Sequence, residues 1–266
     1  MRINAASVAF RHLDVTAADL ARYTLREGFD GLEIWAPHAR ALAQDWTALP
    51  ARPPVPMLAG YLPLGLPGFD LAEARALVDL TRAWDAPKLR LFAGHLGDGQ
   101  AGDRARTAIL RDLTAVAGLA ADQGLHIAIE THPGTLADSL PAVQALLAAL
   151  DHPAVGVNFD VLHVWESGAD PVAAVQALAP HLLHVHLKTV TGRDRLGVFQ
   201  PDNIHDPKGC RQGICPLFEG ALNYPPILAA LPADIDASLE WFGPKPAASM
   251  IADLRQLRAL HHTRAA

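Results

Sequence analysis

The sequence predicts a single (β/α)8 TIM barrel, an α/β fold, on three observations. Eight short runs typical of buried strands alternate with segments of helical periodicity along the 266 residues. This alternation implies parallel pairing, and eight units in about 260 residues fit a closed barrel better than an open doubly wound sheet. No Gly-rich phosphate fingerprint follows the first strand, and no Ser/Gly-rich linker divides the chain. We therefore expect one domain over residues 1–266.

The strands and helices follow from short apolar runs and from 3.6-residue periodicity. The predicted strands are Ala6–Phe10, Gly31–Trp35, Pro56–Tyr61, Lys88–Ala93, His126–Thr131, Val155–Asp160, Leu182–Lys188 and Ala237–Phe242. The predicted helices are Thr16–Glu27, Leu71–Trp84, Asp103–Asp122, Ser139–Leu150, Pro171–Leu178, Pro225–Leu231 and Ala247–Leu260. The connection after the second strand is the least clear, since residues 39–49 could form a short helix.

Helix boundaries agree with these assignments. Thr16 with Asp19, and Asp138 before Ser139, are residues that favour helix N-termini. Gly28 is placed where a helix would end and a strand begin. The stretch 189–224 is the exception, because it is long, irregular and rich in Gly and Pro. Such a loop after the seventh strand is typical of a lid over a binding site.

Composition excludes several function classes. Half of the residues are hydrophobic and 19% are charged, so a core can form without disulfide or metal staples. The formal net charge of −6 and the absence of any Lys/Arg run argue against a nucleic-acid partner. No unbroken apolar stretch approaches the roughly 18 residues of a membrane span, so we expect no membrane association.

The N-terminus and the cysteines indicate the compartment. The opening MRINAASVAFRHLD is too polar for a signal peptide. Cys210 and Cys215 lie in one Gly-rich loop, where two free thiols are favoured over a disulfide. We therefore expect a cytoplasmic protein. The oligomeric state is left open, with a homodimer as one alternative.

Four late strands each carry a polar residue near the carboxyl end, where a barrel strand should be buried. They read HIAIETH, VGVNFDV, LLHVHLK and ASLEWF, and the residues are Glu130, Asp160, His186 and Glu240. Singly, each could be an ion-paired carboxylate or a hydrogen-bonded core histidine. Together, three carboxylates converging on one edge would repel one another, and a divalent cation removes that cost. Mixed oxygen and nitrogen ligands suit Mn²⁺, Mg²⁺ or Co²⁺, and do not exclude Zn²⁺.

Period-two geometry places further residues near this predicted metal site. His132 shares a strand face with Glu130, and Lys188 shares one with His186 and His184. His132 and Lys188 should therefore lie just above the ligands, with His184 one layer deeper. His163 faces inward only if its strand has ended at Asp160.

Arg90 is another charge in a buried strand, and Tyr61 lies at the end of the third strand. Arg90 and Lys188 in one cavity would suit an anionic substrate group, because Arg forks onto carboxylates. The alternative is that Arg90 neutralises a neighbouring Glu such as Glu33. Tyr61 is either a hydrogen-bond donor or a rim aromatic.

Longer strings resemble the bacterial 3-dehydroshikimate dehydratases, which form 3,4-dihydroxybenzoate (protocatechuate) and belong to the xylose-isomerase-like barrels. The strings are ETHPGTLADS, NFDVLHVWESGADP, HVHLK, VFQPDN, CPLFEGALNY and SLEWFG. The four ligands alone are shared by sugar isomerases, epimerases and related lyases. WESGADP, PLFEG and SLEWFG are not needed for metal binding, so they make the resemblance more specific. It is looser over the first 125 residues, which contain Tyr61 and Arg90.

The resemblance implies a hydro-lyase that binds one divalent metal ion, Mn²⁺ first, and a small anionic cyclic substrate. A metal on the ketone oxygen would stabilise the enolate formed when an α proton is removed. His132 is the candidate base, and His163 would assist the leaving hydroxyl or hold the metal-bound oxygen. Lys188, Arg90 and Tyr61 would bind the substrate. Whether the product feeds siderophore synthesis or aromatic catabolism is left open.

Three alternatives remain at this stage. A sugar or hydroxypyruvate isomerase or epimerase would use the same metal, with Glu130 and Glu240 as paired acid and base. An endonuclease for abasic DNA shares the barrel but needs a multi-zinc cluster and a basic surface, which the net charge of −6 argues against. A non-catalytic ligand-binding barrel would not need the full set of ligands and the base.

Overall fold

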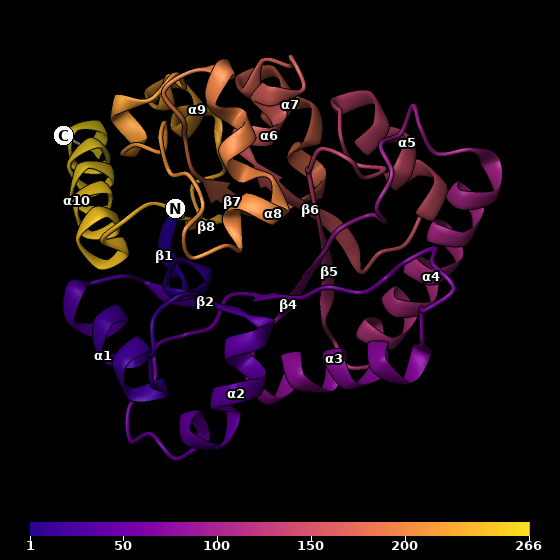
Figure 1. Ribbon diagram of the computed structural model, residues 1–266, viewed down its shortest axis with the longest axis horizontal. Helices are drawn as coiled ribbons and strands as arrows, with labels where there is room; N and C mark the ends of the chain where they lie inside the picture. The colour runs from indigo at the N-terminus through magenta and orange to yellow at the C-terminus, as the bar shows by residue number, and fades with distance from the viewer. Residues whose placement is uncertain (266) are drawn as a thin grey trace.

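Eight parallel strands close into a barrel in the order β1 to β8 in the computed structural model, which describes residues 1–265, with side chains to residue 260 (Figure 1). The strands are β1 (Arg2–Ala6), β2 (Gly31–Trp35), β3 (Leu58–Ala59), β4 (Lys88–Leu91), β5 (His126–Glu130), β6 (Val155–Asp160), β7 (Leu182–Leu187) and β8 (Asp236–Leu239). The predicted TIM barrel is confirmed. Since all neighbours pair in parallel, the strands' carboxyl ends lie at one end of the barrel.

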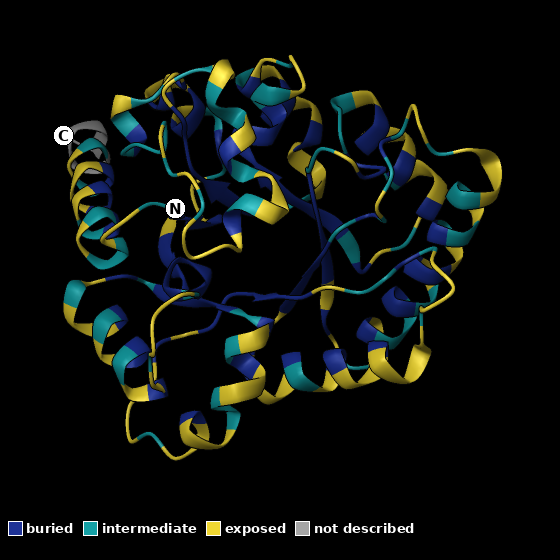
Figure 2. Ribbon diagram, in the orientation of Figure 1, coloured by how far each residue is buried: buried dark blue, intermediate teal, exposed yellow. Residues whose placement is uncertain are grey.

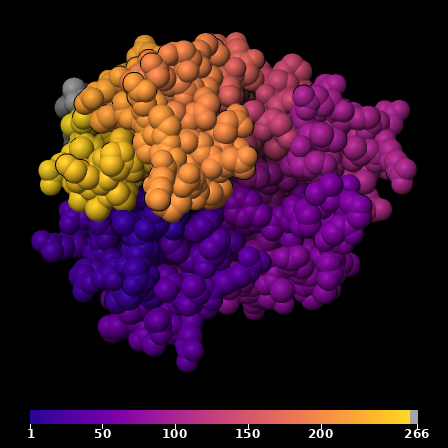
Figure 3. Space-filling view, viewed as in Figure 1, coloured from indigo at the N-terminus to yellow at the C-terminus, as the bar shows by residue number. Residues whose placement is uncertain are grey.

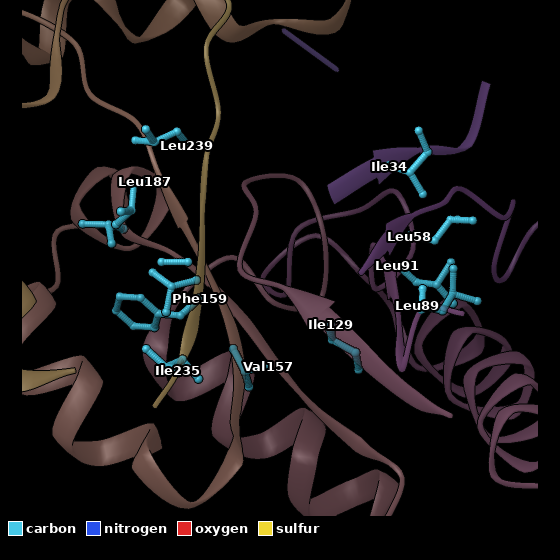
Figure 4. Packing of buried hydrophobic residues seen from close by; sticks show 14 of the residues in the cluster. Ile34, Leu58, Leu89, Leu91, Ile129, Val157, Phe159, Leu187, Ile235 and Leu239 are labelled. Carbon is cyan, nitrogen blue, oxygen red and sulfur yellow. The ribbon is translucent and has the colours of Figure 1, made fainter. Parts of the chain in front are cut away.

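The helices surround the strands and shield them from water. They are α1 (Ala17–Glu27), α2 (Ala36–Thr47), α3 (Leu71–Ala83), α4 (Asp103–Ala121), α5 (Leu140–Leu150), α6 (Val161–Glu166), α7 (Pro171–Leu178), α8 (Pro201–Ile204), α9 (Tyr224–Ala230) and α10 (Pro246–Ala265). Figure 2 shows buried strands at the centre and exposed outer helix faces. Strand residues such as Ile34, Leu89, Ile129, Phe159 and Leu239 belong to the hydrophobic core (Figure 4). The outer strand surface therefore packs in the usual two-layer manner.

Helix boundaries test the predicted caps. Thr16 and Asp19 form a complete capping box at the start of α1, and Gly28 ends that helix with φ of 81°, so both predictions are confirmed. The prediction of an Asp138 cap for α5 is wrong. Ser139 is the N-cap residue and makes no side-chain cap bond, whereas the Asp138 carboxylate accepts a hydrogen bond from Asp98 N. The connection after β2, which the sequence left unclear, is helical, and α2 spans Ala36–Thr47.

The first strand was misplaced by the sequence analysis. The barrel strand is β1, whereas Ser7–Phe10 forms a buried 3₁₀ helix, η1. The apolar run SVAF resembles a strand because burial alone does not distinguish the two structures in a short segment. The true strand was obscured by Asn4, whose side chain faces the interior and donates to the Ala237 carbonyl oxygen at 3.4 Å.

The long loop 189–224 folds as a series of short helices over the carboxyl end of the barrel. It contains η3 (Arg193–Phe199), α8 and η4 (Leu217–Glu219), with an isolated bridge between Val190 and Ile214. Figure 3 shows its orange atoms on the viewer's side, against the N-terminal elements below. Arg11 ties it down by donating from Nε to the Ile204 carbonyl oxygen at 2.9 Å. The described helices include none long and apolar enough to cross a bilayer.

Candidate active site

The four predicted ligands meet at the carboxyl end of the barrel. Glu130 is the last residue of β5, Asp160 is the last of β6, His186 is in β7, and Glu240 directly follows β8. All four are buried. Because neighbouring parallel strands end at the same level, residues far apart in sequence become neighbours here.

The imidazole of His186 is the centre of this ligand group. Its Nδ1 lies 3.6 Å from Glu130 Oε2, 3.8 Å from Asp160 Oδ2 and 3.7 Å from Glu240 Oε2. The structure therefore brings together all four residues that the sequence analysis selected. Asp160 has a second task, since its Oδ1 accepts from the backbone N–H groups of Leu162 and His163 and so begins α6.

The donor set fits a divalent cation. Glu130, Asp160 and His186 offer ligand atoms that lie within 4.8 Å of one another, and Glu240 adds a third carboxylate beside His186. The buried Asn158 Oδ1 accepts no hydrogen bond from a described residue, and the buried Asp160 Oδ2 has the Lys188 ammonium as a charged neighbour at 2.5 Å. A buried oxygen without a donor is costly and clustered carboxylates need cations around them, so a hard cation suits this group. The group is thus a candidate metal site of Glu, Asp and His residues.

Two buried cations contact these carboxylates. Lys188 Nζ lies 2.5 Å from Asp160 Oδ2 and 2.5 Å from Glu240 Oε2, and Arg90 Nε lies 2.9 Å from Glu130 Oε2. Burial by itself raises the pKa of Glu130, but Arg90 and then His186 outweigh burial and hold it well below the usual range. Arg90 therefore neutralises a neighbouring buried Glu, as one interpretation of its sequence held, but this Glu is Glu130 and not Glu33.

Glu33 contacts the ligand group, whereas the sequence analysis named it only as a possible counter-charge for Arg90. It is buried in β2, and its carboxylate lies 3.0 Å from His186 Nε2 and 3.3 Å from His184 Nε2. Because Nε2 faces Glu33, the opposite nitrogen Nδ1 faces the three carboxylates. A carboxylate behind a ligating histidine fixes which nitrogen meets the metal. The available signal was a charge inside the buried run GLEIW, which is the same signal that identified the four ligands.

A continuous row of polar contacts extends from Glu33 down through the barrel interior. His184 Nδ1 lies 3.4 Å from Lys88 Nζ, and Lys88 Nζ lies 2.9 Å from Asp236 Oδ2 at the start of β8. Arg2 closes the row with a 2.7 Å contact to Asp236. His184 therefore lies below the ligands, as predicted, and contacts Glu33, which in turn contacts His186.

Two further histidines lie beside the ligands. The ring centroids of His132 and His163 are 4.6 Å apart, and each ring offers a nitrogen near the Glu130 carboxylate. His163 faces inward because β6 ends at Asp160 and α6 begins at once, as its predicted placement required. His132 Nδ1 lies 2.7 Å from the Pro133 carbonyl oxygen, which can only accept, so Nδ1 holds the proton. Burial, and then His163, lower the pKa of His132 to about 3, which leaves its Nε2 as a free acceptor at neutral pH.

Tyr61 and Arg90 contact each other beside the ligand group. The Tyr61 hydroxyl oxygen accepts from Trp35 Nε1 at 3.0 Å and from Arg90 Nη2 at 3.4 Å. The Arg90 guanidinium also lies over the rings of Tyr61 and Phe92, at 4.8 and 4.6 Å from their centroids. With two donors already at its oxygen, the Tyr61 hydroxyl has its own proton available for a ligand.

Comparison with known proteins agrees with this geometry. Residues 22–260 match the model of the family described as xylose isomerase-like TIM barrel. The chain belongs to the xylose isomerase-like TIM barrel family. A curated member of this family, the 3-dehydroshikimate dehydratase of Bacillus anthracis, is 34% identical over 256 residues, which cover 91% of each chain.

The chain is also similar to a solved structure over nearly its whole length and to a further curated protein over part of its length. The crystal structure of the probable 3-DHS dehydratase AsbF, involved in petrobactin synthesis in Bacillus anthracis, superimposes with a TM-score of 0.92 at 33% identity. That match covers 97% of this chain and 99% of the other. An inosose dehydratase of Clostridium beijerinckii is 28% identical over 120 residues, which cover 45% of this chain and 40% of the relative.

Proposed function

We propose that this protein is a hydro-lyase that converts 3-dehydroshikimate into 3,4-dihydroxybenzoate and water. The observation that carries the proposal is the pair of imidazoles, His132 and His163, held beside the ligand group of Glu130, Asp160, His186 and Glu240. Dehydration of a ring ketone with a β hydroxyl requires a group that removes the α proton and a group that assists departure of the hydroxyl. The 34% identity to the dehydratase of Bacillus anthracis supports this substrate.

The proton transfers balance within the site without an oxidant or reductant. His132, neutral and with a free Nε2, accepts the α proton, and the electron pair of that C–H bond moves toward the ketone to give an enolate. The pair then returns to form the new C=C bond as the C–O bond to the β carbon breaks. The leaving hydroxyl takes a proton from Nε2 of His163 and departs as water, so His163 must enter this step protonated on both ring nitrogens, with Nδ1 donating to Glu166. The proton that His132 has taken up replaces the one that His163 gives up. A second ring proton then moves to the ketone oxygen, which gives the aromatic product.

Glu130, Asp160, His186 and Glu240 would hold one divalent cation. When bound, it supplies Lewis-acid stabilisation of the negative charge that develops on the ketone oxygen. Three carboxylates and one imidazole favour Mn²⁺, with Mg²⁺ and Co²⁺ next and Zn²⁺ as a further candidate. Arg90 and Tyr61 would bind the substrate carboxylate, and Lys188 is the second cationic candidate. We further propose that the chain acts as one catalytic domain in the cytoplasm, with loop 189–224 as its lid.

The isomerase or epimerase alternative has less support. It would use Glu130 and Glu240 as a free acid and base on opposite faces of the substrate. In this structure Arg90 pairs with Glu130 and Lys188 pairs with Glu240, so neither carboxylate is free. The two imidazoles are better placed for proton transfer.

The test is to add 3-dehydroshikimate to metal-free protein, with and without Mn²⁺ or Mg²⁺, and to follow catechol formation by ultraviolet absorbance. Metal-dependent formation of 3,4-dihydroxybenzoate is the expected result. Folded protein that yields no product with Mn²⁺, Mg²⁺, Co²⁺ or Zn²⁺ would overturn the proposal, and a screen of ketoses would then be the next step.

A further inference from the structure

The chain holds a carboxylate behind His163 that the proposed reaction does not yet use. Glu166 Oε2 lies 2.8 Å from His163 Nδ1. Glu166 belongs to the string WESGADP, which has no part in the ligand group. Its side chain is 24% exposed, whereas that of His163 is 4% exposed, so the contact leads from the buried site toward the surface.

Local structure fixes this contact. α6 has only six residues, Val161–Glu166, and the ligand Asp160 caps its N-terminus, which places His163 and Glu166 one turn apart on the same helix face. Arg193 of the long loop donates to the carbonyl oxygens of Trp165 and Glu166 at 2.6 and 3.2 Å. The backbone at the end of α6 is therefore tied to the loop that covers the site.

The contact determines which nitrogen of His163 is available. An ionised carboxylate only accepts, so Nδ1 is the nitrogen that donates to Glu166, and Nε2 remains for the site. Nε2 is also the nitrogen on the side of the ligand group, 3.9 Å from Asp160 Oδ2. The ring cannot turn over without losing its hydrogen bond to Glu166.

We infer that Glu166 is a positioning residue that holds His163 with Nε2 toward the reacting hydroxyl. The expected effect of Glu166 on kcat rests on the proposed dehydration, whereas its expected effect on the His163 tautomer does not. The Ser-His-Asp triad uses the same arrangement of a carboxylate, an imidazole and a reacting group to fix a histidine tautomer. Pro133 does the corresponding task for His132 through a backbone carbonyl.

The structural arm of the test needs no substrate. Imidazole ¹⁵N shifts of His163 in the wild type should report a protonated Nδ1, and in Glu166→Ala they should report a shift toward the Nε2-protonated tautomer. Asp170→Asn is the matched control, since Asp170 lies in the same string and its carboxylate caps α7. Wild-type protein with an unprotonated Nδ1 at His163, or shifts unchanged in Glu166→Ala, would overturn the inference whatever the enzyme's substrate is.

The kinetic arm separates positioning from a general loss of structure. Glu166→Ala should lower kcat by about 10- to 100-fold with little change in KM and with full metal content. Glu166→Gln should retain most of kcat, because its amide oxygen can still accept from Nδ1. In a His163→Ala background, Glu166→Ala should add no further loss, since both changes remove one function. Independent, multiplying losses would contradict the inference. If the wild type does not dehydrate 3-dehydroshikimate, the proposed function fails and the tautomer measurement alone decides the role of Glu166.

Discussion

Strands β5 to β8 deliver carboxylates and imidazoles to the open end of the barrel, whereas β2 to β4 and the residues after them deliver Trp35, Tyr61 and Arg90. The late half therefore offers ligands for a cation, and the early half offers donors for an anion. A substrate with a ketone at one end and a carboxylate at the other would be oriented by this division alone. We expect variants of the late half to affect metal binding and turnover, and variants of the early half to affect KM.

The largest effect should come from the ligands themselves. Asp160→Asn or Glu240→Gln should remove the bound metal and lower kcat/KM by about 10³-fold or more, because each removes one of three anionic donors. Metal content and catechol formation measured on the same sample would check this. Asp253→Asn is the matched control, since Asp253 is a buried carboxylate in α10 that accepts a hydrogen bond from Leu217 N. A ligand variant with wild-type metal content and activity would remove its residue from the site.

The second-largest effect should come from His132, a late-half residue whose loss should lower turnover without affecting metal binding. His132→Ala should lower kcat by about 10²- to 10⁴-fold while the metal stays bound, because the variant lacks the proposed base. Steady-state kinetics with metal analysis would measure both quantities. His126→Ala, an exposed change at the start of the same strand, should leave both unchanged. A kcat within a few-fold of the wild type would assign the base elsewhere.

A Glu33 variant should affect metal binding although Glu33 belongs to the early half, because its carboxylate contacts His186, a ligand from the late half. Glu33→Gln should raise the Kd for Mn²⁺ by about 10- to 100-fold, since the neutral amide holds the His186 ring less firmly. Calorimetric titration of metal-free protein with Mn²⁺ would measure the change. Glu73→Gln, on the exposed face of α3, is the control. An unchanged Kd would show that His186 needs no carboxylate behind it.

The smallest effect should come from the early half. Tyr61→Phe removes one hydroxyl and should raise KM about 2- to 10-fold with kcat nearly unchanged, the usual consequence of losing one neutral hydrogen bond. Initial rates over a range of 3-dehydroshikimate concentrations would show it. If kcat fell instead and KM stayed constant, the Tyr61 hydroxyl would act in the reaction itself and not in substrate binding.

Sequence reasoning found the ligands because each breaks a run of apolar residues at the end of a buried strand. The same reasoning placed His163 correctly, since it required only that the strand end at Asp160. It misplaced β1 because SVAF is more apolar than RINAA, and the true strand carries an inward-facing Asn4. Strength of hydrophobic pattern is therefore a poor guide where a barrel strand has a polar interior face.

Partnerships across the barrel could not be predicted in the same way. Arg90 was expected beside Glu33 or a substrate, and its partner proved to be Glu130, whose strand is the adjacent one. Glu33 was read as a counter-charge and proved to be the partner of two histidines from β7. Glu166 is a half-buried residue at the end of a short helix, and its sequence neighbours do not form the apolar run that made the ligands stand out. Side-chain pairing depends on rotamers and register, which a single sequence does not specify.

A row of polar groups runs through the barrel interior, from Asp236 through Lys88, His184 and Glu33 to His186. The candidate metal site therefore depends on contacts that begin at the opposite end of the barrel. A designer who wished to graft the four ligands onto another eight-stranded scaffold would have to transplant a column of charges along with them. A hydrocarbon interior would remove the Lys88 ammonium that lies beside His184 and leave the Glu33 carboxylate with fewer polar groups around it. We therefore expect substitutions at Arg2 or Asp236, at the far end of this row from the candidate site, to change the affinity for the proposed cation.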